Sequence, residues 1–534
     1  NLDLDSLGSM IATGNVMDIT SKSKGFEFTF DPNQETKLKV GDPAILKQDQ
    51  RKNVTIHEIN ADLGTCILKT TSQDLPSFVS LIPFKFINPG VIESSIRTIT
   101  DDYLKRGKIK NFLKNFFERS APNLKIDGKS DLANIGKDYL DSALKIASSL
   151  DESYLCIQGP PGTGKTYVGA KLIANLVKEG YRVGVSSNSH KAIDNLLQSV
   201  ERDLEDSSIP GLICRINRDD DPFYQDSQRV DRLDSASKVD FKKDYKIFGG
   251  TAWAFSNPIF FEKLDYLFVD EAGQVSLANL VGMSQSSKNL ILMGDQMQLS
   301  QPTVGTHPGN ASLSCLEYLL EGESTIPEDK GILLPETFRL HPKICSFVSK
   351  KIYDEKIYAN KENENRVILP KKNSKYLSDS GIKYVELDHW GNEQASIEEV
   401  NVIHEIVKEL LDSKKLGYLN EQITEKDILI ISPFNHQTRS LQDKLGYKFQ
   451  IGTVDKFQGR EAPIVIISMA SSDIESSPRG AEFLFEKNRL NVAITRAKSL
   501  AIIVGSKNLI KTNYCSINRM NLINFYQDLV KESC

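Results

Sequence analysis

The chain has 534 residues, 40% of them hydrophobic and 26% charged, a composition typical of soluble globular proteins. Its length exceeds what one hydrophobic core supports, so we expect two to four domains. No apolar run approaches the roughly 18 residues that a membrane helix needs, which excludes a spanning segment. With 66 basic and 71 acidic residues the net charge is −5, so any nucleic-acid site must be a local groove.

The cysteines and the first residues indicate the kind of compartment and the origin of the chain. Seven cysteines are scattered with no C-x-x-C pair. This argues against a zinc ribbon, an iron–sulfur cluster or a disulfide framework and favours a reducing, cytoplasmic location. The opening "NLDLDSLGSM" has neither an initiator Met nor the order of a secretory signal, so we expect a processed chain or part of a longer one.

Short β-rich runs separated by turn residues occupy residues 26 to about 90 and predict a small β-barrel. The next segment, "DDYLKRGKIKNFLKNFFERS", interleaves basic and aromatic residues, a pattern that can bind single strands. Because its aromatics recur at helical core spacing, we favour a packed stalk helix. We therefore predict a barrel and stalk over residues 1–128; the family resemblance described below implies that they form an accessory domain, and an interaction module for another partner is the alternative.

A glycine-rich turn then follows the short apolar run "YLCIQ" and precedes an apolar stripe at helical spacing. The turn, "GPPGTGKT", fits G-x-x-x-x-G-K-[ST] in the strand–loop–helix context that the motif requires. Backbone N–H groups of such a loop cradle phosphates, a lysine reaches the β and γ phosphates, and a threonine hydroxyl holds Mg²⁺. The predicted phosphate-binding residues are Gly159, Pro160, Pro161, Gly162, Thr163, Gly164, Lys165 and Thr166.

Two further strands carry polar groups at their ends. The run "KLDYLFVDEAGQ" ends in Asp270, which we predict to hold Mg²⁺, and Glu271, which could activate the attacking water. The run "NLILMGD" leads to Gln298, a candidate γ-phosphate sensor. The second half of the chain repeats buried strands, "DILIISP", "PIVIISM" and "SLAIIVG", without a second P-loop. There Arg339 and Arg496 could reach the γ-phosphate from a second lobe, although a surface arginine is the simpler reading.

The ordered segments "GPPGTGKT", "DEAGQ", "GDQMQLSQP", "ETFRLHP", "GTVDKFQGRE" and "NVAITRAK" resemble motifs I to VI of superfamily 1B helicases. The likeness is greatest to the branch that contains the nonsense-mediated-decay helicase and the DNA-replication helicase/nuclease. Finer features, among them "GYRVGVSSNSHKAIDNLL", are similar to prokaryotic proteins in which a RecB-like nuclease precedes the helicase. A nuclease domain is therefore expected in the parent chain.

The resemblance implies roles for particular residues. Lys165, Glu271, Gln298, Arg339 and Arg496 would act in catalysis, and Thr166 and Asp270 would hold the metal. Glu461 would contact the ribose and Gln437 would lie near the nucleotide. Ser186, Asn188, Thr251 and Thr453 would touch the nucleic-acid backbone, because small polar groups bind phosphate without reading bases. One departure is that the segment upstream of the P-loop lacks the glutamine that recognises adenine in such relatives.

We therefore predict an α/β protein with two RecA-like P-loop motor domains, residues 129–328 and 329–534, built on parallel sheets. It would be a monomeric ATP- and Mg²⁺-dependent helicase on single-stranded DNA, moving 5′→3′ in DNA repair or replication. The alternatives are an RNA helicase with the same motor, or an ATP-gated nucleic-acid clamp that supports a nuclease without unwinding.

Overall fold

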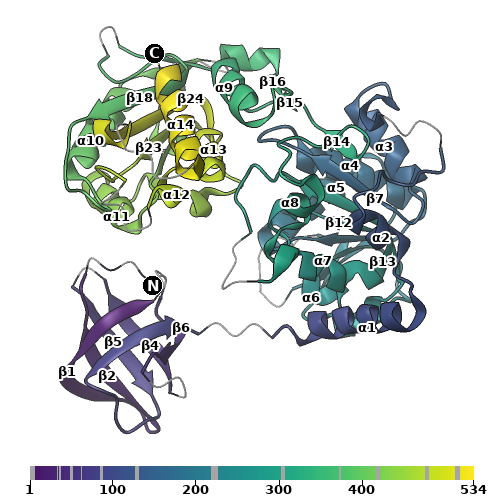
Figure 1. The fold of residues 1–534 in the computed structure, drawn as a ribbon, viewed down its shortest axis with the longest axis horizontal. Helices are drawn as coiled ribbons and strands as arrows, with labels where there is room; N and C mark the ends of the chain where they lie inside the picture. Colours follow the sequence, from purple (N-terminus) through teal and green to yellow (C-terminus); the bar gives the residue numbers. More distant parts are fainter. Residues whose placement is uncertain are drawn as a thin grey trace. The chain divides into compact units, whose positions relative to one another are not determined.

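The structure of the chain is a computed structural model, shown in Figure 1. It describes residues 6–32, 34, 36, 38–48, 52–61, 63–84, 88–126, 131–217, 227–301, 307–371, 374–416, 421–474, 480–510 and 517–533. Contacts divide the chain into two units, Asn1–Asn88 and Pro89–Cys534, and each is described by itself. No helix within the described ranges combines the length and the apolar character needed to cross a bilayer.

The first unit is a small antiparallel barrel, closed in the order β1-β2-β5-β4-β3-β6. Side chains alternate between its interior and solvent, as in β5, where Cys66, Leu68 and Thr70 are buried. The barrel predicted from the short β-rich runs is thereby confirmed. Its strands are β1 (Leu7–Thr20), β2 (Ser23–Thr29), β3 (Pro43–Leu46), β4 (Asn53–Asn60), β5 (Thr65–Thr70) and β6 (Phe78–Pro83).

The segment expected to be one stalk helix folds as two helices, α1 (Gly90–Arg106) and α2 (Asn111–Phe117). Gly107 ends α1 in the left-handed region at φ 63°, which any residue other than glycine adopts with strain. Both helices belong to the second unit, not to the barrel: Ser95 donates a 2.7 Å hydrogen bond to the Gly282 carbonyl, and Phe116 lies in the core of the first lobe. The accessory domain predicted over residues 1–128 therefore ends near residue 88.

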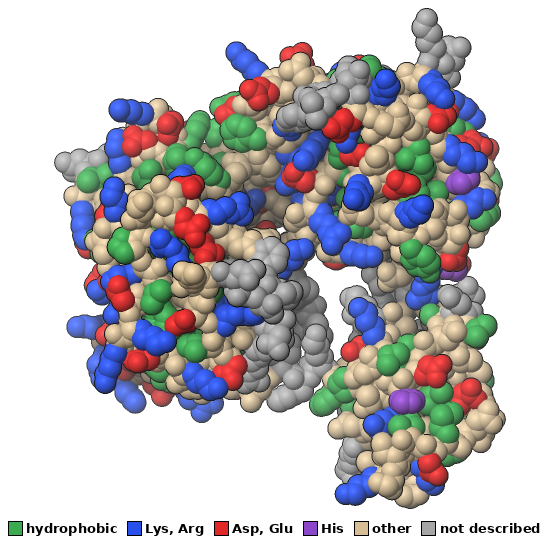
Figure 2. All heavy atoms as spheres, turned by 180° about the vertical axis from the view of Figure 1, so that it is seen from behind, with side chains coloured by type: hydrophobic (Ala, Val, Ile, Leu, Met, Phe, Trp, Pro, Cys, Tyr) green, Lys and Arg blue, Asp and Glu red, His purple; other side chains and the backbone are tan. Residues whose placement is uncertain are grey.

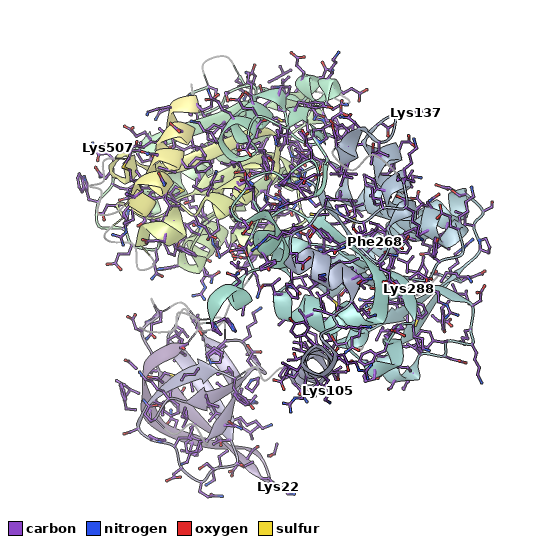
Figure 3. The ribbon with its side chains drawn as sticks, turned by 45° about the vertical axis from the view of Figure 1, so that its right-hand side comes forward. Lys22, Lys105, Lys137, Phe268, Lys288 and Lys507 are labelled. Carbon is purple, nitrogen blue, oxygen red and sulfur yellow. The ribbon has the colours of Figure 1, made fainter. Side chains whose placement is uncertain are left out.

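The first lobe of the second unit is a parallel eight-stranded sheet in the order β10-β9-β11-β8-β12-β13-β7-β14. Apolar clusters cover both of its faces, so its central strands are buried throughout. Figure 3 shows Phe268 of β12 inside this lobe, while Lys105, Lys137 and Lys288 point outward. The strands are β7 (Tyr154–Gln158), β8 (Val183–Ser186), β9 (Leu212–Ile216), β10 (Val230–Leu233), β11 (Tyr245–Gly249), β12 (Leu264–Val269), β13 (Ser287–Gly294) and β14 (Gly331–Leu333).

The helices of this lobe are α3 (Tyr139–Ser149), α4 (Lys165–Lys178), α5 (His190–Asp206), α6 (Ala252–Phe255), α7 (Leu277–Met283) and α8 (Cys315–Leu320). The lobe extends slightly beyond the predicted boundary at residue 328. Strand β14 still pairs with β7, with Ile332 opposite Ile157, before the chain leaves for the second lobe.

The second lobe is a parallel five-stranded sheet in the order β18-β24-β23-β21-β22. Two apolar clusters pack on it, so both lobes have the layered architecture of a RecA-like domain, as predicted. The sheet strands are β18 (Gly381–Leu387), β21 (Ile428–Ile431), β22 (Gln450–Gly452), β23 (Ala462–Ser468) and β24 (Ala497–Ser506). The helices are α9 (Pro342–Ile352), α10 (Ile397–Leu411), α11 (Asn435–Leu445), α12 (Gly480–Leu484), α13 (Lys487–Ile494) and α14 (Ile517–Glu532).

Two minor sheets complete the lobe, β15 (Glu336–Thr337) with β16 (Tyr358–Ala359), and β17 (Val367–Leu369) with β19 (Lys414–Leu416) and β20 (Glu421–Gln422). On the face drawn in Figure 2, basic and acidic side chains are interspersed, in line with the small net charge.

Candidate nucleotide-binding site

The glycine-rich loop joins β7 to α4, and α4 begins at Lys165. Gly162 and Gly164 have φ of 79° and 84°, so the chain turns there through conformations that favour glycine. The Lys165 ammonium donates a hydrogen bond to the Gly159 carbonyl and thus lies folded over its own loop. The loop therefore presents backbone N–H groups, a lysine and a helix N-terminus at one place, the arrangement that binds phosphate.

Two carboxylates follow β12 at the carboxyl edge of the same sheet. Asp270 is buried, and burial together with Glu271 raises the pKa of its carboxyl to about 7, while Lys165 acts to lower it. Glu271 has φ 53°, an uncommon backbone conformation that turns the chain directly after the strand. A cation bound beside such a carboxylate would stabilise its charged form.

Gln298 comes from the loop after β13. Its amide donates a 2.9 Å hydrogen bond to Oδ2 of Asp295, and both side chains are buried. Gln298 also lines the cavity beside the P-loop, in the position expected of a γ-phosphate sensor.

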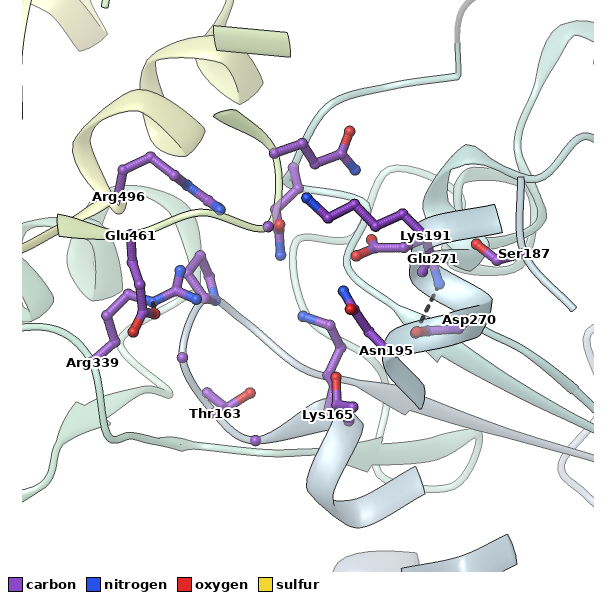
Figure 4. Close-up of a pocket in the computed structure, with 18 of the residues that line it drawn as sticks. Thr163, Lys165, Ser187, Lys191, Asn195, Asp270, Glu271, Arg339, Glu461 and Arg496 are labelled. Carbon is purple, nitrogen blue, oxygen red and sulfur yellow. Dashed lines mark hydrogen bonds and ion pairs between the residues drawn. The ribbon is translucent and has the colours of Figure 1, made fainter. Parts of the chain in front are cut away.

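The second lobe contributes two arginines to the same cavity, which has a volume of about 600 Å³ (Figure 4). Arg496 is 2% exposed and donates to the carbonyls of Val492 and Arg460. Burial, aided by nearby Arg339, lowers the pKa of the Arg496 guanidinium to about 9. Among the described residues no carboxylate forms an ion pair with it, so this buried cation faces a cavity suited to an anion.

Arg339 lies on the loop after β15, which contacts the P-loop directly. The backbone N–H of Phe338 donates to the Gly162 carbonyl at 2.9 Å, and the Thr337 hydroxyl donates to the Pro161 carbonyl at 2.8 Å. The Arg339 guanidinium itself forms a 2.5 Å ion pair with Glu461. The loop that carries one arginine of the second lobe is thus hydrogen-bonded to the phosphate loop of the first.

Glu461, expected at the ribose, also pairs with Lys498 at 2.7 Å. Burial acts to raise the pKa of its carboxyl, but Arg339 and Lys498 outweigh that effect and hold the pKa below its usual range. The carboxylate is therefore charged and held between two cations at the cavity wall. Its contact with a ribose stays a prediction.

The structure gathers most of the predicted nucleotide-site residues around the one cavity. Gly159 and Pro160 begin the same loop but do not line the cavity, whereas the others do: Pro161, Gly162, Thr163, Gly164, Lys165, Thr166, Asp270, Glu271, Gln298, Arg339, Glu461 and Arg496. Gln437 differs from expectation. It is fully buried, its amide donates to the Ser468 hydroxyl at 2.8 Å and its side-chain carbonyl accepts from the Ser396 N–H, so it lies away from the cavity.

The four residues expected to touch nucleic acid lie at carboxyl ends of parallel strands. Ser186 is buried at the end of β8, Thr251 follows β11, and Thr453 follows β22 in the second lobe. Asn188 lines the nucleotide cavity, and its amide donates to the Gln274 carbonyl. Parallel strands bring their carboxyl ends to one edge, where ligands of such sheets bind.

Several cavity residues lie outside the motif assignments. Lys191 and Asn195, one turn apart on α5, line the cavity, and Figure 4 shows the Lys191 side chain extending into it. Their i, i+4 spacing after the N-cap Ser189 is a signal that sequence reasoning could have used. Arg366 also lines it and donates to the carbonyls of Phe338 and Arg339, a tertiary contact with no local sequence signal.

The donors present suit Mg²⁺ rather than a transition metal. The Thr166 hydroxyl and the Asp270 carboxylate line the cavity together, and both are the hard oxygen ligands that Mg²⁺ prefers. Across the described ranges no group of three or more His, Cys, Asp or Glu could hold a metal by itself. A cation here would be shared between few side chains and the phosphates, as is usual for Mg²⁺ with nucleotides.

Comparison with known proteins agrees with this site. Family models described as "AAA domain" match residues 141–308 and 311–508. The DNA replication ATP-dependent helicase/nuclease of Gallus gallus is 25% identical over 542 residues, which cover 94% of this chain and 51% of that protein. The DNA polymerase alpha-associated DNA helicase A of Schizosaccharomyces pombe is 26% identical over 83% of this chain and 75% of its own.

The chain thus spans about half the length of the Gallus gallus relative. A solved complex of the arterivirus nonstructural protein 10 helicase with DNA aligns over 93% of this chain and 79% of its own, at 12% identity and a TM-score of 0.41, too low to establish a shared overall fold.

Two RecA-like lobes that share one P-loop cavity define a P-loop nucleoside triphosphatase of the two-lobed motor class. Within that class the chain is similar to ATP-dependent DNA helicases, and the family models that match its two lobes are described as AAA domains.

Proposed function

We propose that this chain is the Mg²⁺-dependent motor of a helicase that moves 5′→3′ along single-stranded DNA in repair or replication. The observation that supports it best is the composite cavity: Lys165, Asp270 and Glu271 from one lobe face Arg339 and Arg496 from the other. Hydrolysis in such a cavity changes the contacts between the two lobes. ATP hydrolysis is therefore coupled to how tightly the lobes hold the nucleic-acid strand.

In this proposal each group has a defined task. Lys165 and the P-loop N–H groups bind the phosphates, and Thr166 and Asp270 would hold Mg²⁺, which would supply positive charge beside the phosphates. Glu271 orients the attacking water and accepts its proton. Arg339 and Arg496 stabilise the negative charge that grows on the γ-phosphate, and the buried, carbonyl-bound state of Arg496 means that the cation is already desolvated for this.

DNA is proposed as the track because the two relatives described above are a DNA replication helicase/nuclease and a DNA polymerase-associated DNA helicase. Thr251 and Thr453 at the carboxyl strand ends would contact the strand backbone, whereas Ser186 is too buried to do so. The chain would act as a monomer next to a RecB-like nuclease domain of the same parent chain. The five described cysteines are buried free thiols, which supports a reducing, cytoplasmic compartment.

The basic test is the replacement Lys165→Ala. We expect strand-stimulated ATP hydrolysis to fall by at least about 100-fold, because the phosphate contact in the transition state is lost, while binding to single-stranded DNA is retained. Lys178→Ala, an exposed lysine at the end of the same helix, is the matched control and should hydrolyse ATP normally. Retained hydrolysis in Lys165→Ala would remove the assignment.

Substrate and direction are settled by unwinding of DNA and RNA duplexes that carry either a 5′ or a 3′ single-stranded tail. The proposal expects unwinding of the 5′-tailed DNA duplex. Unwinding of RNA alone would make the chain an RNA helicase, and strand-stimulated ATPase without any unwinding would make it a clamp.

A further inference from the structure

A buried chain of hydrogen bonds joins the two lobes. Asp295 Oδ2 accepts from the Gln298 amide at 2.9 Å and from the Tyr353 hydroxyl at 2.8 Å. That hydroxyl in turn accepts from Asn491 Nδ2 at 3.0 Å, and Asn491 Nδ2 also donates to the Met297 carbonyl at 2.7 Å. We call Gln298, Asp295, Tyr353 and Asn491 the inter-lobe network, because the first two lie in the first lobe and the last two in the second.

The inter-lobe network is sealed from solvent. Tyr353 and Asn491 have no exposed surface, and Asp295 is 3% exposed. Hydrogen bonds between such buried groups are stronger than in water. A buried polar group without a partner is also more destabilising than an exposed one. Asn491 Oδ1 has no partner among the described residues, so the network is not fully satisfied in this arrangement.

One end of the inter-lobe network reaches the nucleotide cavity, and the other end lies on the helix that leads to Arg496. Gln298 lines the cavity directly. At the other end, Asn491 lies on α13, and its carbonyl accepts from the Thr495 hydroxyl at 2.7 Å, next to Arg496. Tyr353 is the link between the two ends, because its hydroxyl donates to Asp295 and accepts from Asn491.

The sharing of Asp295 Oδ2 makes the two ends interdependent. When Gln298 turns toward a γ-phosphate, Oδ2 loses one of its two side-chain donors, and the Tyr353 hydroxyl becomes the remaining one. A shift of that hydroxyl alters its hydrogen bond with Asn491 Nδ2. Because Asn491 Oδ1 accepts no bond among the described residues, the amide can form a second set of hydrogen bonds. Two alternative sets of bonds of this kind are what couples one site to another.

We propose that Tyr353 is a positioning residue that couples γ-phosphate sensing by Gln298 in the first lobe to the placement of Arg496 in the second. The proposal rests on the proposed function, since it assigns Tyr353 to the same hydrolysis cycle. Tyr353 contacts no substrate. It acts through Asp295 and Asn491.

The test compares Tyr353→Phe, which removes only the hydroxyl, with Tyr266→Phe. Tyr266 is also buried, and its hydroxyl donates a 2.9 Å bond to the Ala147 carbonyl within one lobe. We expect Tyr353→Phe to lower strand-stimulated kcat about tenfold while the Kd for ATP stays within about twofold, because the lost bond acts after binding. Tyr266→Phe should keep wild-type kcat at a similar loss of thermal stability.

The partner Asp295→Asn completes a double-mutant cycle. Because the two groups act as one unit, the double variant should be no slower than the worse single variant. Additive losses, or a stimulated kcat of Tyr353→Phe within about twofold of wild type, would overturn the inference while leaving the proposed function intact. Should Tyr353→Phe not fold, Asn491→Ala removes the tyrosine's other partner and must show the same kcat effect. Absence of strand stimulation in the wild type would instead contradict the proposed function.

Discussion

Arg496 is a buried cation that forms no ion pair with a carboxylate among the described residues, although Glu271 and Glu461 lie near enough to favour its charged form. Burial of a charge costs several kcal/mol on general grounds, and the hydrogen bonds to the Val492 and Arg460 carbonyls, together with the nearby Glu271 and Glu461 carboxylates, offset part of that cost. Stability alone would favour an apolar residue at the position. The cation is explained if the missing partner is an anionic ligand, which makes the burial of Arg496 itself an indicator of function.

His341 provides a pH-dependent contribution to stability. It caps α9, where its Nδ1 accepts from the Lys343 N–H at 3.2 Å, and burial together with Lys343 lowers the pKa of its imidazole. As the pH falls, the His341 imidazole therefore binds a proton near pH 6.5 in the unfolded chain and only at a lower pH in the folded chain. The contribution is fully present above about pH 6.5 and is lost as the pH falls through that value toward the lowered folded-state pKa.

We predict that His341→Asn, which keeps a capping acceptor, loses less stability than the wild type between pH 7.5 and 5.5. Urea unfolding followed by circular dichroism at several pH values measures the difference. His307→Asn replaces an exposed histidine and should behave as the wild type does. An equal pH slope in His341→Asn and wild type would show that the histidine is not responsible.

At the residue scale, local sequence patterns predicted the motif residues of the site. Residues whose positions depend on tertiary contacts could not be predicted in this way. The P-loop, Asp270 and Glu271 are recognisable because fixed spacing places them at a strand end or helix start. Gln437 sits in an equally suggestive segment, yet the rotation of α11 turns it into the lobe, where Ser468 and Ser396 bind it. Tyr353 carries no local signal at all, since its partners Asp295 and Asn491 come from a distant loop and from α13.

At the scale of elements, the segment around β15 lies so close to the P-loop that Gly162 tolerates no side chain. A Cβ there would be 2.3 Å from the Arg339 Cβ and 2.7 Å from the Thr337 hydroxyl. The φ of 79° adds backbone strain of roughly 1–2 kcal/mol for alanine. The packing of the loop that carries Arg339 against the P-loop therefore depends on Gly162.

We predict that Gly162→Ala lowers ATPase kcat at least tenfold and destabilises the protein more than Gly180→Ala does. Gly180 also has positive φ, 95°, but a Cβ there would meet nothing within 4 Å. Gly180→Ala therefore measures the effect of backbone strain without a steric clash. Hydrolysis rates and thermal melts of the two variants separate the steric effect from the strain. Equal behaviour of the two would mean that the contact with the Arg339 loop has no consequence.

The helices α1 and α2 show what an amphipathic pattern leaves open. Helical spacing of the aromatic residues predicted a face packed on a core, and Phe112, Leu113 and Phe116 of α2 are indeed buried. It could not say which core they join, because apolar faces are chemically alike. The answer lies in the specific bonds, such as that of the Lys110 ammonium to the carbonyls of Gln285 and Ser287, both at 3.1 Å.

At the scale of the whole molecule, the barrel has what an independent domain needs. The strands described for it close on themselves and leave no unpaired edge within the described residues, and its interior has its own apolar cluster that includes Phe28, Ile56 and Leu81. Its boundary after Asn88 falls directly before α1, whose bonds are to the first lobe.

We therefore predict that residues 1–88 fold when produced alone and that residues 89–534 keep the ATP affinity of the full chain within about twofold, since every cavity residue lies in the second unit. Circular dichroism and a cooperative thermal transition test the first part, and nucleotide titration of the shortened chain tests the second. An unfolded 1–88 fragment would mean that the barrel draws its stability from the motor. A loss of ATP binding on its removal would mean that the nucleotide cavity depends on a unit that contributes none of its walls.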